Sequence, residues 1–172
     1  AARGKEKALA SKPASFFTPR DAALVEVGNL EDDLPRLAEC DWVVEAVKED
    51  LGVKRALFAR IEPDLKPSAI VASNTSGLPL ADLTQGRSEA FRKSFLITHF
   101  FNPVRYMRLL ELVVGPETSP ELAASMQRFA EEKLGKGTVH AKDSPNFIAN
   151  RIGTFAVFDA IQHMVAMDLS VD

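Results

Sequence analysis

The sequence predicts an α/β fold built on a mainly parallel sheet. Short apolar runs alternate along the chain with longer segments in which apolar side chains recur at helical spacing. Ala69–Ser73 is apolar without alternation, which is typical of a strand that is buried on both faces of a parallel sheet. Strands and helices that alternate in this way favour one sheet with helices packed on its faces.

The N-terminal third is predicted to contain helix, strand and helix. Ala2–Lys12 is basic and alanine-rich, so we expect a helix that Pro13 ends. Ala23–Val27 is expected to form a short strand. Asn29 is expected to cap a helix over Leu30–Glu39, because three acidic residues fall where the positive end of the helix dipole favours them.

The middle of the chain is predicted to hold two central strands with a helix between them. Trp42–Val47 and Ala69–Ser73 are the strands, and the helix runs over about Leu51–Ile61. Its buried stripe is expected to consist of Leu51, Leu57, Phe58 and Ile61.

The C-terminal half is predicted to contain three strands and two helices. The strands are Ile97–Phe101, Met107–Val114 and Thr138–Ala141, and the helices are Pro120–Leu134 and Asn146–Met167. Ser119 is expected to be the N-cap of the first helix, and Gly135 is expected to follow its last residue. The second helix is expected to bury apolar residues on more than one side, namely Phe147, Ile148, Ile152, Phe155, Phe158, Ile161 and Val165.

A histidine and a glutamate occupy two of these strands and form a candidate catalytic pair. If the strands around His99 and Glu111 are neighbours, the two side chains can meet. A carboxylate on one ring nitrogen fixes the tautomer and leaves the other nitrogen to take a proton from a hydroxyl. A histidine in an apolar run is also common as a satisfied core residue. Glu111, however, lies in an apolar strand and needs a partner there.

Polar residues also gather at the predicted carboxyl ends of the strands, where ligands of open α/β sheets bind. Ser76 follows one strand and is either part of a turn or cap or a substrate ligand. Asn102 follows the histidine strand and is a candidate cofactor contact. Glu49 and Lys54 follow Trp42–Val47 and are candidate cofactor-binding residues, with a solvated surface as the alternative.

Composition excludes several classes of protein. A formal net charge of -3 gives no reason to expect a nucleic-acid partner. No apolar run has the length of a membrane span, and no signal peptide pattern opens the chain. The single cysteine, Cys40, fits a reducing cytoplasm. No metal is expected, because Cys40 has no companion and the histidines at 99, 140 and 163 lack ligand spacing.

Four motifs in one order resemble the 3-hydroxyacyl-CoA dehydrogenase family. They are Ser73-Asn74-Thr75-Ser76, the H-F-F-N-P-V run from His99, Glu111 and the segment Lys142–Arg151. The resemblance implies NAD as cofactor and a 3-hydroxyacyl-CoA substrate. It implies that His99 is the general base, Glu111 its orienting partner, and Ser76 and Asn150 the groups that hold substrate.

The resemblance also implies a domain organisation. We expect an incomplete Rossmann-like NAD-binding domain over residues 1–142 and the first long helix of an all-α, dimerising domain over 143–172. The family's G-x-G-x-x-G turn, which receives the cofactor pyrophosphate, does not occur in the sequence. The chain is therefore expected to be an internal part of an enzyme, similar to the dehydrogenase part of long bacterial fatty-acid-oxidation proteins that also carry an enoyl-CoA hydratase region.

Two other hypotheses about the function remain open. One is a related NAD(P)-dependent hydroxyacid dehydrogenase, but such enzymes tend to use a lysine base on the long helix, where this sequence has Asn150. The other is a non-catalytic acyl-CoA-binding or assembly piece.

Overall fold

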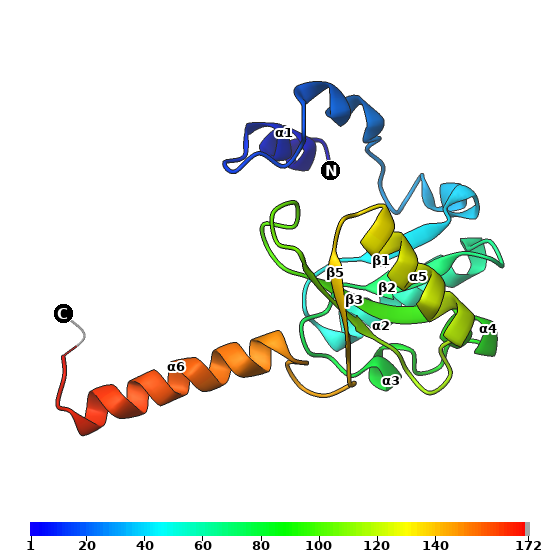
Figure 1. The fold of residues 1–172 in the computed structure, drawn as a ribbon. Helices are drawn as coiled ribbons and strands as arrows, with labels where there is room; N and C mark the ends of the chain where they lie inside the picture. The colour runs from blue at the N-terminus through cyan, green and yellow to red at the C-terminus, as the bar shows by residue number, and fades with distance from the viewer. Residues whose placement is uncertain (171–172) are drawn as a thin grey trace.

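A computed structural model describes residues 1–170 and has the predicted α/β architecture (Figure 1). Its sheet has the order β1-β2-β3-β4-β5. The first three strands are parallel, β4 runs antiparallel to β3, and β5 runs parallel to β4. The strands are β1 (Trp42–Glu45), β2 (Ile70–Ser73), β3 (Phe95–Phe100), β4 (Leu109–Val113) and β5 (Gly137–Ala141).

Six α-helices and three short 3-10 helices accompany the sheet in the described part of the chain. The α-helices are α1 (Ala2–Ala10), α2 (Leu51–Ile61), α3 (Leu80–Leu83), α4 (Glu89–Lys93), α5 (Pro120–Glu132) and α6 (Ala149–Ala166). The 3-10 helices are η1 (Pro19–Leu24), η2 (Leu34–Glu39) and η3 (Glu62–Asp64). The helices α3 and α4 lie in a stretch for which the sequence analysis assigned no element.

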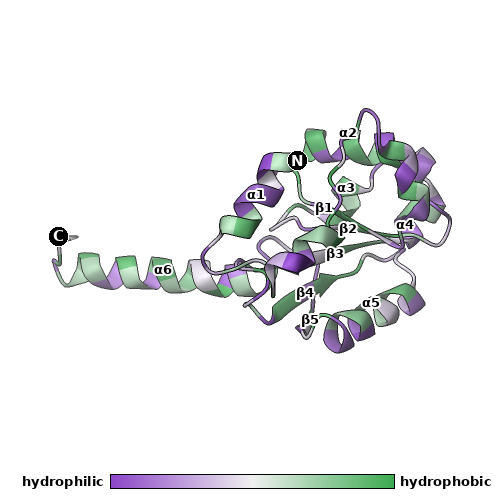
Figure 2. Cartoon of the chain, turned by 90° about the horizontal axis from the view of Figure 1, so that it is seen from above, coloured by the Kyte–Doolittle hydropathy of each residue, from purple (hydrophilic) through white to green (hydrophobic). Residues whose placement is uncertain are grey.

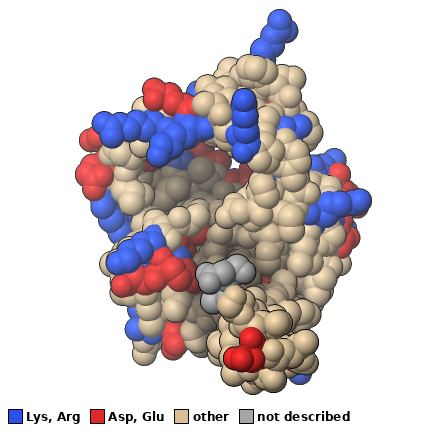
Figure 3. Space-filling view, turned by 90° about the vertical axis from the view of Figure 1, so that its left-hand side faces the viewer, with Lys and Arg blue, Asp and Glu red and all other residues tan. Residues whose placement is uncertain are grey.

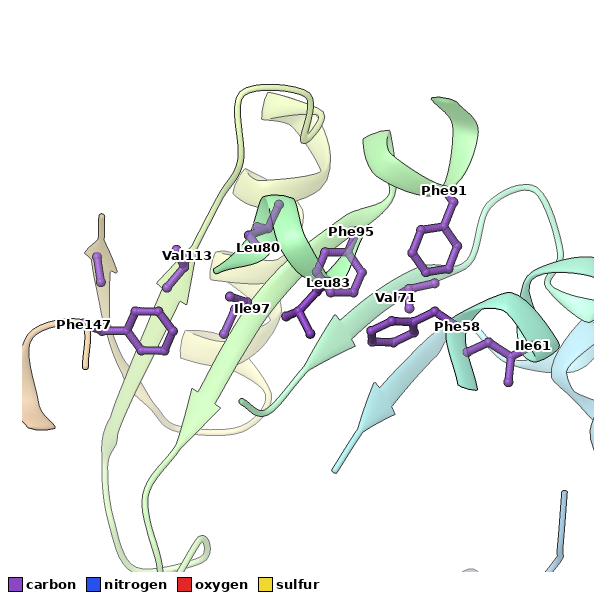
Figure 4. Packing of buried hydrophobic residues seen from close by; sticks show 11 residues of the cluster. Phe58, Ile61, Val71, Leu80, Leu83, Phe91, Phe95, Ile97, Val113 and Phe147 are labelled. Atoms are coloured by element: carbon purple, nitrogen blue, oxygen red, sulfur yellow. The ribbon is translucent and has the colours of Figure 1, made fainter. Parts of the chain in front are cut away.

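The sheet is the middle of three layers (Figure 2). On one face, α2, α3 and α4 bury an aromatic cluster, in which the Phe58 ring lies 5.7 Å from Phe91 and 5.3 Å from Phe95 (Figure 4). On the other face, Met126 and Ala130 of α5 pack against the sheet. Polar N-caps fix where α2 and α5 begin: Asp50 accepts a hydrogen bond from the Val53 amide, and Ser119 from the Leu122 amide.

Two N-terminal predictions are wrong. Ala23–Val27 is not a strand; β1 is the edge of the sheet, and Val25 and Val27 are exposed beside no partner strand among the described residues. The predicted helix over Leu30–Glu39 is a turn followed by η2. Asn29 does accept the Glu31 and Asp32 amides as a cap would, but Pro35 prevents a regular α-helix from continuing through the segment.

The chain by itself does not provide the predicted burial of α6. Helix α6 projects away from the sheet (Figure 1), and none of its residues is buried. Phe155, Phe158 and Val165 are 72%, 63% and 76% exposed, and Ile148, Ile152 and Ile161 are exposed as well. Only Phe147, just before the helix, is buried as predicted. An exposed apolar surface of this kind is typical of a face that another surface covers.

We predict that the 172-residue chain expressed by itself self-associates through α6. Replacing Phe155 and Phe158 together by Ser should reduce the association, because it removes two large apolar side chains that contact little else in the chain. Multi-angle light scattering over a concentration series measures the effect. A stable monomer of the unchanged chain at all concentrations contradicts the prediction.

Candidate active site

The predicted histidine–glutamate pair forms on neighbouring strands. His99 of β3 is the register partner of Glu111 of β4, and its Nδ1 lies 2.7 Å from Glu111 Oε2. His99 is 4% exposed and Glu111 is completely buried. Because a carboxylate only accepts hydrogen bonds, Nδ1 donates in this contact and Nε2 is the nitrogen that can receive a proton.

The second carboxylate oxygen of Glu111 is held by backbone. The amides of Ile148 and Ala149 donate to Oε1 at 3.0 and 2.8 Å. These amides lie at the N-terminus of α6, where no intrahelical carbonyl is available to them. Glu111 therefore has the partners that a buried carboxylate needs, and its position is fixed from both sides.

A second buried polar cluster lies at the carboxyl end of β1. The Lys54 ammonium of α2 is 2.7 and 2.9 Å from the two oxygens of Glu45 and 3.1 Å from Glu49 Oε2. The side chains of Lys54 and Glu45 are each 1% exposed, whereas that of Glu49 is 45% exposed. Lys54 thus lies in the interior rather than on the surface, and it holds Glu49 at the boundary with solvent.

The turn after β2 completes this cluster. The Thr75 hydroxyl and the Ser76 amide donate to Glu49 Oε1, and the Ser73 hydroxyl donates to Glu45. Partial burial by itself raises the pKa of Glu49, but the hydrogen bonds from Thr75, Ser76 and Lys54 outweigh it and hold that pKa below its ordinary value. Glu49 is therefore an ionised acceptor at neutral pH.

The remaining predicted site residues surround these two clusters. Ser76 is exposed and links them: its amide binds Glu49, and the next residue, Gly77, packs against Asn146 just before α6. Asn150 is partly exposed and directly follows Ala149, whose amide binds Glu111. Asn102 is exposed on the loop after β3. Within residues 1–170, no hydrogen bond joins the side chains of Ser76, Asn102 and Asn150.

Sequence reasoning missed Glu45 and the two α6 amides. Glu45 could have been found by the argument used for Glu111, since it also lies in an otherwise apolar strand and requires a partner there. The amides of Ile148 and Ala149 are backbone groups, so the residue types in the sequence do not indicate that they bind Glu111.

A hollow of about 900 Å³ lies beside Asn102. Arg105, which lines it, donates hydrogen bonds to the carbonyls of Ala14 and Phe16 in the N-terminal segment. Lys136, which also lines it, donates hydrogen bonds to the carbonyls of Val104 and Met107, and burial lowers the pKa of Lys136. Its lining includes Lys12, Phe17, Phe100, Asn102, Arg105 and Tyr106.

No single sign of charge dominates the side of the molecule shown in Figure 3, where the surface is hollowed and basic and acidic side chains are interspersed. Within residues 1–170, no helix combines the length and the apolar character that crossing a membrane requires. The same residues contain no group of three or more histidine, cysteine or acidic side chains placed to hold a metal ion.

The chain also matches a known protein family. The family model described as "3-hydroxyacyl-CoA dehydrogenase, NAD binding domain" matches residues 3–144. The chain belongs to this family. The family assignment confirms the predicted fold class, and the cofactor of the domain is NAD.

Named relatives agree with the assignment. The chain is 47% identical over 161 residues to a probable 3-hydroxyacyl-CoA dehydrogenase of Deinococcus radiodurans, covering 94% of this chain and 46% of that protein. It is 42% identical over 151 residues to a putative fatty acid oxidation complex trifunctional enzyme of Rickettsia felis, covering 88% of this chain and 21% of that protein. Among solved structures, FadB2 of M. tuberculosis superposes with a TM-score of 0.80 at 30% identity, covering 99% of this chain and 59% of that chain. The chain therefore spans less than half the length of these two curated relatives.

The residues present fit part of an NAD site. Glu49 is a carboxylate acceptor held by Lys54 at the carboxyl end of a parallel strand, and a carboxylate at such a place can accept hydrogen bonds from hydroxyl groups. Lys54 has its ammonium engaged by Glu45 and Glu49, so in this structure it orients Glu49 rather than facing solvent.

We predict that Lys54→Met destabilises the protein by about 3–5 kcal/mol, because it leaves the buried Glu45 carboxylate without its cation. The matched control is Lys93→Met, which breaks a solvent-exposed pair with Glu89 and should leave the free energy of unfolding nearly unchanged. Urea unfolding followed by circular dichroism measures both. Equal losses in the two variants contradict the account of this cluster.

Proposed function

We propose that the protein containing this chain is an NAD-dependent 3-hydroxyacyl-CoA dehydrogenase, which oxidises (S)-3-hydroxyacyl-CoA to 3-oxoacyl-CoA in fatty acid β-oxidation. The observation that carries the proposal is the buried His99–Glu111 pair with its free imidazole nitrogen. Membership of the family and the printed names of the relatives support the substrate class.

In the proposed mechanism, Nε2 of His99 takes the proton of the 3-hydroxyl group. Bound NAD, held by Glu49, Ser76 and Asn102, would supply the acceptor for the hydride of the carbon that carries this hydroxyl group. Glu111 stabilises the imidazolium through the 2.7 Å contact at Nδ1. Ser76 and Asn150 orient the hydroxyl and the thioester carbonyl, so that the hydroxyl oxygen faces His99.

The proposed cofactor contacts divide into direct and indirect ones. Glu49, Ser76 and Asn102 are exposed polar residues at the carboxyl ends of β1, β2 and β3, and we assign them to direct contact with NAD. Lys54 is buried, and we assign it the indirect task of holding Glu49.

The proposal extends to the organisation of the whole protein. Residues 1–142 contribute to the NAD-binding domain, and residues 143–172 begin a helical domain that pairs two copies. The relative from Rickettsia felis is named as a putative fatty acid oxidation complex trifunctional enzyme, which supports a multifunctional polypeptide. We propose an enoyl-CoA hydratase region as one of its other parts. The single cysteine fits a cytoplasmic location.

One assay separates this proposal from its alternatives. The whole protein is mixed with NAD and 3-hydroxybutyryl-CoA, and the reduced cofactor is followed by absorbance. Reduction with the CoA thioester supports the proposal. Reduction only with free hydroxyacids supports a related hydroxyacid dehydrogenase, and no reduction with either supports a non-catalytic acyl-CoA-binding piece.

We predict that His99→Gln lowers kcat by at least about a hundredfold and leaves the affinity for NAD nearly unchanged, because the base is lost while the cofactor contacts remain. The control is His140→Gln on β5, where the ring is exposed and bonded to Gln127, and its kcat should match that of the unchanged protein. Steady-state kinetics and calorimetry with NAD give the two quantities. Near-normal turnover of His99→Gln removes the proposed mechanism.

A further inference from the structure

The connection between β5 and α6 contains an unusual backbone turn. Asn146 and Phe147 are consecutive, and both have positive φ, at 65° and 46°. Residues other than glycine rarely adopt this left-handed region, although asparagine tolerates it better than most. Two such residues in succession persist only where the surrounding structure enforces them, and they point to a task for the turn.

The turn directs two amides at one oxygen. Immediately after Phe147, the amides of Ile148 and Ala149 both donate to Glu111 Oε1, at 3.0 and 2.8 Å. Helix α6 begins at Ala149, so the direction of the whole helix is fixed by the same contact. A helix that followed β5 through ordinary extended or helical backbone would present its first amides elsewhere.

Contacts on both sides hold this turn in place. The Asp143 carboxylate accepts the Leu80 amide at 3.1 and 3.0 Å. A Cβ atom at Gly77 would lie 3.2 Å from the Asn146 nitrogen, so the loop that carries Ser76 packs closely against the turn. Phe147 is 2% exposed, and its ring lies 5.6 Å from the ring of His99.

We propose that the segment Asp143–Ala149 is a positioning element for the His99–Glu111 pair, and that Asn146 is its positioning residue. By accepting positive φ, Asn146 lets the chain turn so that the Ile148 and Ala149 amides hold Glu111 at the correct orientation for His99. The role in catalysis rests on the proposed function, whereas the role in placing Glu111 does not. The same contact makes the orientation of α6 and that of the pair depend on each other.

The test uses backbone preference at a single position in the whole protein. Asn146→Gly removes the side chain but accepts positive φ readily, whereas Asn146→Val disfavours it strongly. We expect Gly to keep kcat within about twofold and Val to lower it by roughly tenfold or more, with KM for NAD unchanged, because a small displacement of a catalytic group has effects of this size. Asn146→Ala, which is milder, replaces Val if that variant does not fold.

A spectroscopic readout makes the test independent of activity. In protein labelled with 15N-isoleucine and 15N-alanine, the amide protons of Ile148 and Ala149 should lie downfield because they donate to a carboxylate. They should move upfield in Glu111→Ala, which removes the acceptor oxygen and so gives the shift expected for a lost contact. They should move as far in Asn146→Val but not in Asn146→Gly.

Each outcome decides the proposal. If Val loses kcat and the downfield signals while Gly keeps both, the turn positions the pair. If Val keeps both, the turn does not depend on the residue at 146 and the proposal is wrong. If Gly loses as much as Val, the asparagine side chain rather than the backbone turn is what matters, and the proposal is again wrong. If the unchanged protein shows no dehydrogenase activity, the proposed function fails, and the amide signals alone still decide whether the turn places Glu111.

Discussion

The buried carboxylate of Glu111 is the constraint on which the candidate active site depends. A carboxylate removed from water is stable only if its oxygens are fully bonded. In this chain, one oxygen binds the His99 ring and the other binds two backbone amides. Three separate segments, β3, β4 and the start of α6, must therefore meet at a single side chain, and the antiparallel register of β3 and β4 places His99 opposite Glu111.

The same physical rule operates a second time at the carboxyl end of β1. Glu45 is buried and bonded to Lys54 and Ser73, and Lys54 in turn holds the more exposed Glu49. Breaking a buried pair is costly, so both clusters fix the positions of polar groups more firmly than surface contacts do. The Ser73–Ser76 turn lies between the clusters, because its Ser76 amide binds Glu49 and its neighbour Gly77 packs against Asn146.

The sequence could predict those parts of the fold that local physics determines. Ser119 and Pro120 indicated where α5 begins, and Gly135 indicated that it ends shortly before that residue. The position of Glu111 in an apolar strand indicated that it has a buried partner, which is His99. The failures have equally physical causes. Pro35 interrupts the predicted helix over residues 30–39, and Ala23–Val27 has no neighbouring strand among the described residues.

Within the site, side-chain chemistry was predictable and backbone chemistry was not. His99 and Glu111 were found from residue type and strand position. The burial of Lys54 was not, because its partner Glu45 lies on another element and no periodicity links the two. The amides that hold Glu111 depend on a left-handed turn at Asn146 and Phe147. Asparagine tolerates such backbone, but it does so in many turns, and phenylalanine gives no signal of it.

A double-mutant cycle on His99 and Glu111 tests the central claim that the two side chains act as one unit. The values of kcat are measured for the unchanged protein, His99→Gln, Glu111→Gln and the double variant. If the pair acts as one unit, kcat of the double variant is about equal to kcat of the His99→Gln variant. Losses that multiply independently would show that Glu111 does not act through His99, and would contradict this account.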